Sequence, residues 1–296
     1  MYRFACCTGV LLMLASSAGA VMVYAPNGVS RPYPFSGPDE LVRFDTSNPA
    51  AFEVVGSMNV PNIGFGGMEF DADGNLWAYA SFYKPTGGAA AGLYHVDTTT
   101  GAATLQGTAS TQPLDDLAFN PVDGKMYGVR SQYNSTRLYS INLATGATSL
   151  VGYFSGLPTE VHRVVGMAID STGAFYLQDV GVDKIYKGTG LALAELYSLP
   201  QDTNYSQGLA IDWSRNDTGY HGAVGQGEFP NFFSQINTFA TDGSAYTLGP
   251  DFGPNEMIEG YGYPLVQPND LAIVPIPEPG ALLLLAVGAM FCGRRR

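Results

Sequence analysis

Short apolar stretches alternate with Asp/Gly turns along most of the chain, and the same pattern returns four times. Each copy begins with a short apolar strand that ends in an Asp or Asn. A turn follows, and then a second strand, which is rich in aromatic residues in the first copies. The first strands of the four copies end at Asp71, Asn120, Asp170 and Asp212. Hairpin turns of this kind need positive φ, which Gly, Asn and Asp tolerate. The pattern therefore predicts repeated antiparallel hairpins.

A second hairpin follows each of these copies. It has alternating apolar positions on both sides of a Gly-containing turn, and its first strand starts at Leu93, Leu138, Lys184 or Ser234. Two hairpins in succession predict a four-stranded antiparallel meander. The meanders recur about every 40 to 50 residues, which is the range of propeller blades.

The two ends of this repeating body complete the pattern. Leu41–Asp45 begins a fifth copy of the second hairpin, but the first, inner strand of a blade does not precede it. Asp270–Val274 resembles a fifth inner strand, but the rest of a blade does not follow it. Val21–Tyr24 can supply the missing second strand, and joining the ends would pair two exposed edges. Residues 21–275 therefore resemble a β-propeller of about five four-stranded blades, closed by its N- and C-terminal strands. A pair of β-sandwiches is the alternative all-β fold.

The amino-acid composition agrees with an all-β body, and the net charge excludes one class of binding partner. The chain has 37 Gly and 19 Pro in 296 residues, which helical bundles avoid. With 14 basic and 26 acidic residues the net charge is −12, which argues against a generic nucleic-acid binder because phosphate backbones need a basic surface. The three cysteines, Cys6, Cys7 and Cys292, all lie in the terminal segments, so the body is expected to fold without disulfides.

Residues 1–20 have the order of features of a secretory signal peptide. Arg3 gives a positive start, Ala5–Ala15 is apolar, and Ala18-x-Ala20 matches the small-residue pattern that signal peptidase cleaves. We therefore expect export, with a buried N-terminal helix as the alternative.

Residues 276–296 form a second signal. Pro277, Glu278 and Pro279 precede an apolar run over 281–292, and the chain stops at Arg294, Arg295 and Arg296. Twelve apolar residues make a helix of only about 18 Å, a marginal membrane span, and the arginines favour a cytoplasmic end.

This tail resembles the PEP-CTERM sorting signal of Gram-negative bacteria. The resemblance implies handling by an exosortase, transient insertion of the tail in the inner membrane, and a final place at the outer cell surface or in the extracellular matrix. A eukaryotic lipid-anchor signal also has an apolar tail but lacks the Pro-Glu-Pro motif and the arginine stop.

Catalytic motifs are missing from the sequence. There is no Gly-x-Ser-x-Gly, His-Glu-x-x-His, P-loop or Cys/His cluster, and His95, His162 and His221 fall on different repeats. Gly64–Gly67 is glycine-rich, but an apolar strand follows it where a phosphate-binding loop would open a helix, so we interpret it as a loop between blades.

Three carboxylates are weak candidates for a metal site. Glu69, Asp116 and Asp270 lie on predicted inner strands, which would line the central channel, and converging carboxylates suit Ca²⁺. Against this, such residues also bond local backbone amides, and glycine stands at the matching positions of other repeats. We therefore expect no cofactor, with Ca²⁺ as the alternative.

Aromatic residues supply the candidate binding surface. Trp77 and Tyr79 alternate in a predicted strand and are expected in the core between blades. Aromatics in long connections are better ligand-binding candidates, because long loops carry function: Phe229, Phe232, Phe233, Tyr261 and Tyr263. The alternative is that these rings cover the ends of the blades.

Taken together, these features predict an exported, non-enzymatic propeller that acts as a binding or scaffold module. An extracellular glycan or matrix component is the expected ligand, because the tail implies a polysaccharide-producing host. A Ca²⁺-dependent propeller hydrolase or lactonase is the competing hypothesis. Fold alone supports neither.

Overall fold

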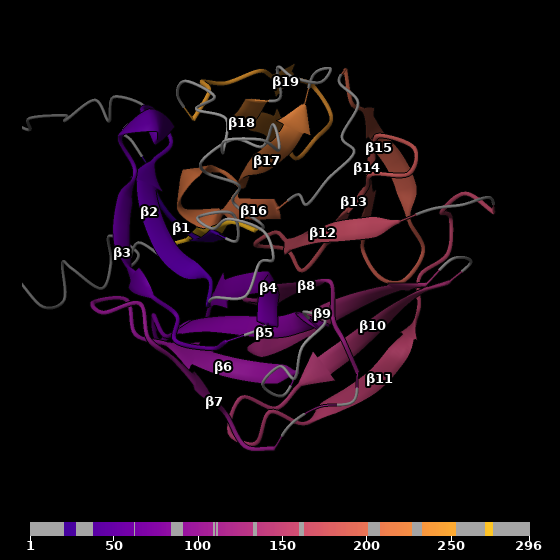
Figure 1. Cartoon of the computed structure of the whole chain (residues 1–296). Coiled ribbons are helices and arrows are strands. Elements are labelled where there is room, and N and C mark those ends of the chain that lie inside the picture. The colour runs from indigo at the N-terminus through magenta and orange to yellow at the C-terminus, as the bar shows by residue number, and fades with distance from the viewer. Residues whose placement is uncertain are drawn as a thin grey trace, which may run out of the picture.

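The computed structural model describes residues 21–27, 38–61, 63–83, 91–108, 110, 112–132, 135–159, 163–200, 208–226, 233–252 and 270–274. These residues form five antiparallel sheets of four strands each, arranged in a ring (Figure 1). The predicted signal peptide at 1–20 and the tail at 276–296 lie outside the described residues, and so does the helix predicted over 281–292. Within the described part, no helix is long and apolar enough to cross a membrane.

We number the sheets as blades 1 to 5 and give the strands from the inside of the ring outward. Blade 1 has β20 (Ala272–Ile273), β1 (Met22–Asn27), β2 (Glu40–Asp45) and β3 (Glu53–Ser57). Blade 2 has β4 (Ile63–Phe70), β5 (Leu76–Tyr83), β6 (Gly92–Val96) and β7 (Ala103–Leu105). Blade 3 has β8 (Asp116–Asn120), β9 (Lys125–Gln132), β10 (Ser135–Ile141) and β11 (Thr148–Tyr153).

The remaining two blades follow the same order. Blade 4 has β12 (Val164–Ile169), β13 (Phe175–Asp179), β14 (Lys184–Gly188) and β15 (Ala194–Ser198). Blade 5 has β16 (Gly208–Asp212), β17 (Thr218–Gln226), β18 (Phe233–Ala240) and β19 (Tyr246–Thr247). Two 3-10 helices also occur in the described part, η1 (Pro49–Ala51) and η2 (Trp213–Arg215). The predicted five-bladed propeller is confirmed, and the sandwich alternative is wrong.

The two ends of the body close the ring, as predicted. In blade 1, Val23 pairs with Ile273 and Tyr24 pairs with Ala272, which joins the last strand of the body to the first. The Val274 N–H also donates to the Met22 carbonyl, 3.3 Å away. Because β20 is the inner strand of blade 1, the closure completes the lining of the ring.

The first-hairpin turns show why Asp and Gly recur. In the turn after β4, Asp71 Oδ1 accepts the amides of Asp73 and Asn75 at 3.0 and 2.9 Å, and Gly74 has a φ of +80°. This side-chain bonding mimics a backbone turn, and the positive φ favours glycine. In the longer turn of blade 5, Asn216 and Asp217 take the positive φ values, 53° and 54°.

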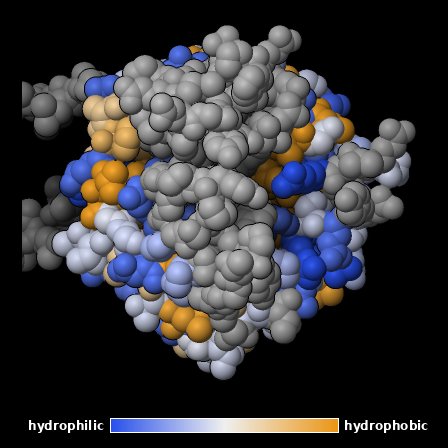
Figure 2. All heavy atoms as spheres, viewed as in Figure 1, coloured by the Kyte–Doolittle hydropathy of each residue, from blue (hydrophilic) through white to orange (hydrophobic). Residues whose placement is uncertain are grey.

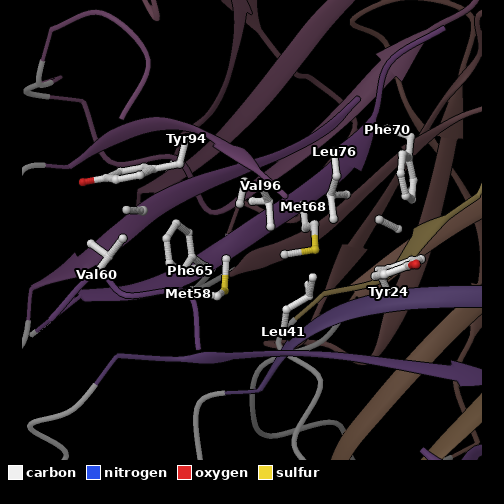
Figure 3. Packing of buried hydrophobic residues seen from close by; sticks show 13 residues of the cluster. Tyr24, Leu41, Met58, Val60, Phe65, Met68, Phe70, Leu76, Tyr94 and Val96 are labelled. Atoms are coloured by element: carbon white, nitrogen blue, oxygen red, sulfur yellow. The ribbon is translucent and has the colours of Figure 1, made fainter. Parts of the chain in front are cut away.

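The hydrophobic core lies between neighbouring blades. Figure 3 shows one such cluster, in which Tyr24 and Leu41 of blade 1 meet Phe65, Met68 and Leu76 of blade 2. Trp77 and Tyr79 are buried in the equivalent cluster between blades 2 and 3, as predicted for core aromatics. Each sheet therefore buries both faces, which is the packing that a ring of blades requires.

The interpretation of Gly64–Gly67 as a loop between blades is wrong. These residues belong to β4, which pairs with β5 through two irregularities in register at this point. A Cβ on Gly67 would lie 2.6 Å from the Leu117 nitrogen of blade 3. The glycine is thus needed because the inner strands of blades 2 and 3 approach closely, and a bulged strand resembles a loop in sequence.

The ring has two different faces, which we call the loop face and the turn face. Inner strands begin at the loop face, and the antiparallel order brings the ends of the second strands and the starts of the third strands to the same face. The turn face carries the short turns, such as the one at Asp71–Asn75. In the view of Figure 2, hydrophobic and hydrophilic described residues are mixed along the rim of the ring.

Candidate functional site

Two carboxyl groups meet at the centre of the ring. Asp270 precedes β20 and Asp116 begins β8; both side chains are fully buried, and they share a hydrogen bond. They come from blades 1 and 3, which blade 2 separates. At the equivalent position of blade 2 stands Gly67, where a Cβ would lie 2.8 Å from the Asp116 Cα.

Backbone amides also hold each carboxyl group. Asp270 Oδ1 accepts the Leu271 N–H at 2.7 Å, and its Oδ2 accepts the Met68 N–H of blade 2 through a short hydrogen bond. Asp116 makes the same pair of bonds, with Leu117 at 2.6 Å and with Met167 of blade 4. Each aspartate thus ties its own inner strand to the next blade.

Burial raises the pKa values of both carboxyl groups. Loss of water raises the pKa of Asp270 to about 7 and holds the pKa of Asp116 well above its usual range, and the mutual proximity of the two groups adds to the effect at Asp116. Two carboxylates this close cannot both ionise cheaply, so the pair keeps a proton near neutral pH.

Glu69 completes the predicted trio. Its half-buried side chain accepts the Phe70 N–H at 2.8 Å and bonds the backbone amide of Phe119 in blade 3. Burial raises its pKa well above the usual range, and the charge of Asp270 contributes to the same shift. The structure therefore brings Glu69, Asp116 and Asp270 into one electrostatic neighbourhood at the axis.

The carboxylate oxygens of Asp116 and Asp270 are engaged with the backbone. Every carboxylate oxygen of Asp116 and Asp270 already accepts a backbone amide, and a Ca²⁺ ion needs six to eight free oxygen ligands. Among the described residues, no three His, Cys, Asp or Glu side chains are placed to hold a metal ion together. The arrangement suits a structural role that links blades.

The two described histidines, His95 and His221, lie on different blades and do not meet. His221 is buried in blade 5, its Nδ1 lies 2.6 Å from the Tyr246 hydroxyl, and burial lowers its pKa to about 3, so it stays neutral. His95 is exposed, with its ring beside that of Trp77. His162 lies outside the described residues.

Most of the predicted aromatic candidates also lie outside the described residues, namely Phe229, Phe232, Tyr261 and Tyr263. Phe233 does not sit in a connection, because it is the first residue of β18 and pairs with Gln226. The described strand ends that flank 227–232 and 253–269 belong to the loop face. Phe229, Phe232, Tyr261 and Tyr263 stay predictions.

Sequence reasoning missed a row of side chains across blade 3. Arg130 of β9 pairs with Arg137 of β10, and Arg137 pairs with Tyr153 of β11, so the three side chains share one face of the sheet. The signal was the β9–β10 hairpin, whose short connection after Gln132 sets Arg130 opposite Arg137. The row lies at the loop-face end of the blade.

Comparison with known proteins identifies the C-terminal signal. Residues 275–296 match the PEP-CTERM protein-sorting motif, which confirms the tail predicted over 276–296. No curated protein is significantly similar to the chain in sequence.

Solved structures resemble the body in fold. A chain from the crystal structure of a nidogen/laminin complex is 12% identical with a TM-score of 0.51, covering 86% of this chain and 98% of that one. TolB from Acinetobacter baumannii is 14% identical with a TM-score of 0.45, covering 78% of this chain and 53% of that one. At such identities the first likeness concerns the fold alone. The chain is a five-bladed β-propeller that carries a PEP-CTERM protein-sorting motif at its C-terminus.

Proposed function

We propose that this protein is exported, processed by an exosortase, and displayed at the cell surface or in the extracellular matrix, where its propeller acts as a non-enzymatic binding or scaffold module. The observation that carries the proposal is the sorting motif at 275–296. Signal peptidase removes residues 1–20, and the tail inserts transiently in the inner membrane of a Gram-negative host before processing.

The buried axis favours a non-enzymatic role over a hydrolase or lactonase. A catalytic acid or base must reach a substrate atom, but Asp116 and Asp270 are fully buried and engaged with backbone amides. The loop face is the better binding surface, since the connections that carry Phe232 and Tyr263 join strand ends there. An extracellular glycan or another matrix component is the proposed ligand.

Replacing Pro277, Glu278 and Pro279 together by alanine is expected to abolish tail processing. The motif is removed while the apolar run and the arginines remain, so the chain still reaches the membrane. Mass spectrometry of protein from the native host measures the result: the parent should lack the arginine tail, and the variant should keep it. The parent chain in a host without exosortase is the matched control and should behave as the variant does. A variant processed like the parent would refute sorting through this motif.

Adding Ca²⁺ is expected to leave the melting temperature unchanged. A ligand that binds only the folded state stabilises it in proportion to its excess over the dissociation constant, and we propose that the axial carboxyl groups offer no free oxygen ligands. The measurement is thermal unfolding with millimolar Ca²⁺ and with a chelator. A rise of several degrees that Asp116→Asn abolishes would instead support the metal-dependent hypothesis.

A further inference from the structure

The row across blade 3 is unusual in an acidic protein. Arg130 and Arg137 are direct cross-strand neighbours, and like charges placed directly opposite each other destabilise a sheet. The chain has only 14 basic residues and a net charge of −12, yet two of them face each other here. Such a placement needs a compensating negative charge.

Asp115 compensates only the inner end of the row. Its Oδ2 accepts the Ser131 N–H at 2.6 Å, and the charges of Arg163 and Arg130 favour its ionised form. Burial outweighs these effects and raises its pKa to about 6. Arg130 also donates to Gln112 Oε1. Among the described residues, Arg130 and Arg163 thus act on the Asp115 carboxyl group, whereas Arg137 lies over the Tyr153 ring.

The guanidinium of Arg137 is incompletely hydrogen-bonded in the described part of the chain. Its Nε is buried without a hydrogen bond, although such groups are nearly always paired in folded proteins. Its guanidinium lies over the Tyr153 ring, 5.4 Å from the centroid, and Tyr153 is 52% exposed on the outer strand. A guanidinium with an unmet donor therefore stands beside an accessible aromatic ring.

We propose that the row formed by Arg130, Arg137 and Tyr153 binds an acidic polysaccharide that carries carboxylate groups on its sugar rings. Arginine matches a carboxylate with two parallel hydrogen bonds, and the negative charge of the carboxylate would offset the opposed charges of Arg130 and Arg137. Tyr153 offers an amphipathic ring on which the apolar face of a sugar packs. A uronate unit presents both features within one residue.

This inference rests on the proposed binding role and adds a place and a ligand class to it. A flexible acidic peptide would also meet the arginines, but its carboxylates stand on mobile side chains without a flat face for Tyr153. The observed pairing of ring and guanidinium therefore favours a glycan. The two ligand classes separate in a binding experiment.

The experiment measures binding of the full-length protein to polygalacturonate, to a neutral glucan and to poly-glutamate. Polygalacturonate is expected to bind, and more weakly as salt screens the arginines. Arg137→Ala should weaken this binding about tenfold or more, because it removes a charged hydrogen-bond donor. Tyr153→Ala should weaken it about threefold. Arg43→Ala removes an arginine that is paired with Glu53 on blade 1, and it should bind as the parent does.

Several results would overturn the proposal. Equal binding of polygalacturonate by the parent and by both row variants would exclude the site, and equal binding of poly-glutamate with the same loss in Arg137→Ala would show a peptide site. Binding of the neutral glucan that neither variant affects would leave the general binding role standing but refute this place and ligand class. Arg137→Lys keeps the charge and loses the paired donors, so it should also bind more weakly, and its melting temperature checks that the fold is intact.

Discussion

Deleting residues 270–274 is expected to destabilise the propeller by about 5 kcal/mol or more, which is comparable with the whole stability of many domains. The deletion removes the buried side chains of Leu271, Ala272 and Ile273 and the ladder that joins β20 to β1. It also removes Asp270, which ties blade 1 to blade 2. A fall in melting temperature of roughly 10 °C or more is expected for a chain of this size.

The matched control for this deletion ends the chain after residue 275, which keeps β20 and removes only the tail. Thermal unfolding of this control should coincide with that of the parent. Leu271→Ala gives a milder version of the deletion and should cost about 2–5 kcal/mol, because it leaves a cavity at a fully buried position. A deletion variant that melts like the parent would show that the terminal strands do not close the ring.

The free energy of unfolding is expected to fall as the pH rises above about 6.5. Asp270 has a folded pKa of about 7, against about 3.9 in an unfolded chain, so the folded state holds a proton that the unfolded state has lost. This stability is fully present below the unfolded pKa and disappears as the pH rises through the folded pKa. The whole shift corresponds to roughly 4 kcal/mol, most of which is lost between about pH 4 and 7, so only the last part of the Asp270 loss falls above pH 6.5. Asp116 and Glu69, with pKa values raised well above normal, extend the loss to higher pH.

His221 acts in the opposite direction at lower pH. Burial lowers its pKa to about 3, so its contribution is present above about pH 6.5 and is lost as the pH falls toward 3. Between about pH 4 and 6.5 the histidine and the carboxyl pair therefore offset each other, and the window above 6.5 isolates the carboxyl pair.

The variant Asp270→Asn tests whether the buried carboxyl pair causes this loss of stability with rising pH. The amide can donate to Asp116 as the protonated carboxyl does, but its nitrogen cannot accept a backbone N–H, so a cost of about 1–3 kcal/mol is expected at acidic pH. Because one ionisable partner is gone, the decline of stability with rising pH should be shallower than in the parent. Urea unfolding at about pH 6.5 and 9 measures both effects. Asp73→Asn, at an exposed turn position, is the control and should keep the parent slope.

Local sequence determined the elements and the architecture of the body. Asp71 with Gly74, and their counterparts after β8 and β12, specify turns through side-chain hydrogen bonds and positive φ, which are properties of a few adjacent residues. The unpaired strands at the two ends predicted ring closure, since an exposed edge needs a partner. The sorting motif is likewise a contiguous stretch of sequence, so it can be identified without knowledge of the fold.

Tertiary structure alone decided which side chains meet. Asp116 and Asp270 are far apart in the chain and become partners only because the ring closes and Gly67 lets the inner strands approach. Gly64–Gly67 looked like a loop because glycine permits turns as well as close strand contacts, and only the neighbouring blade distinguishes the two. The row of Arg130, Arg137 and Tyr153 depends on strand register, where a shift of one residue would send each side chain to the opposite face. Proximity across strands and blades is set by packing, which no single stretch of sequence encodes.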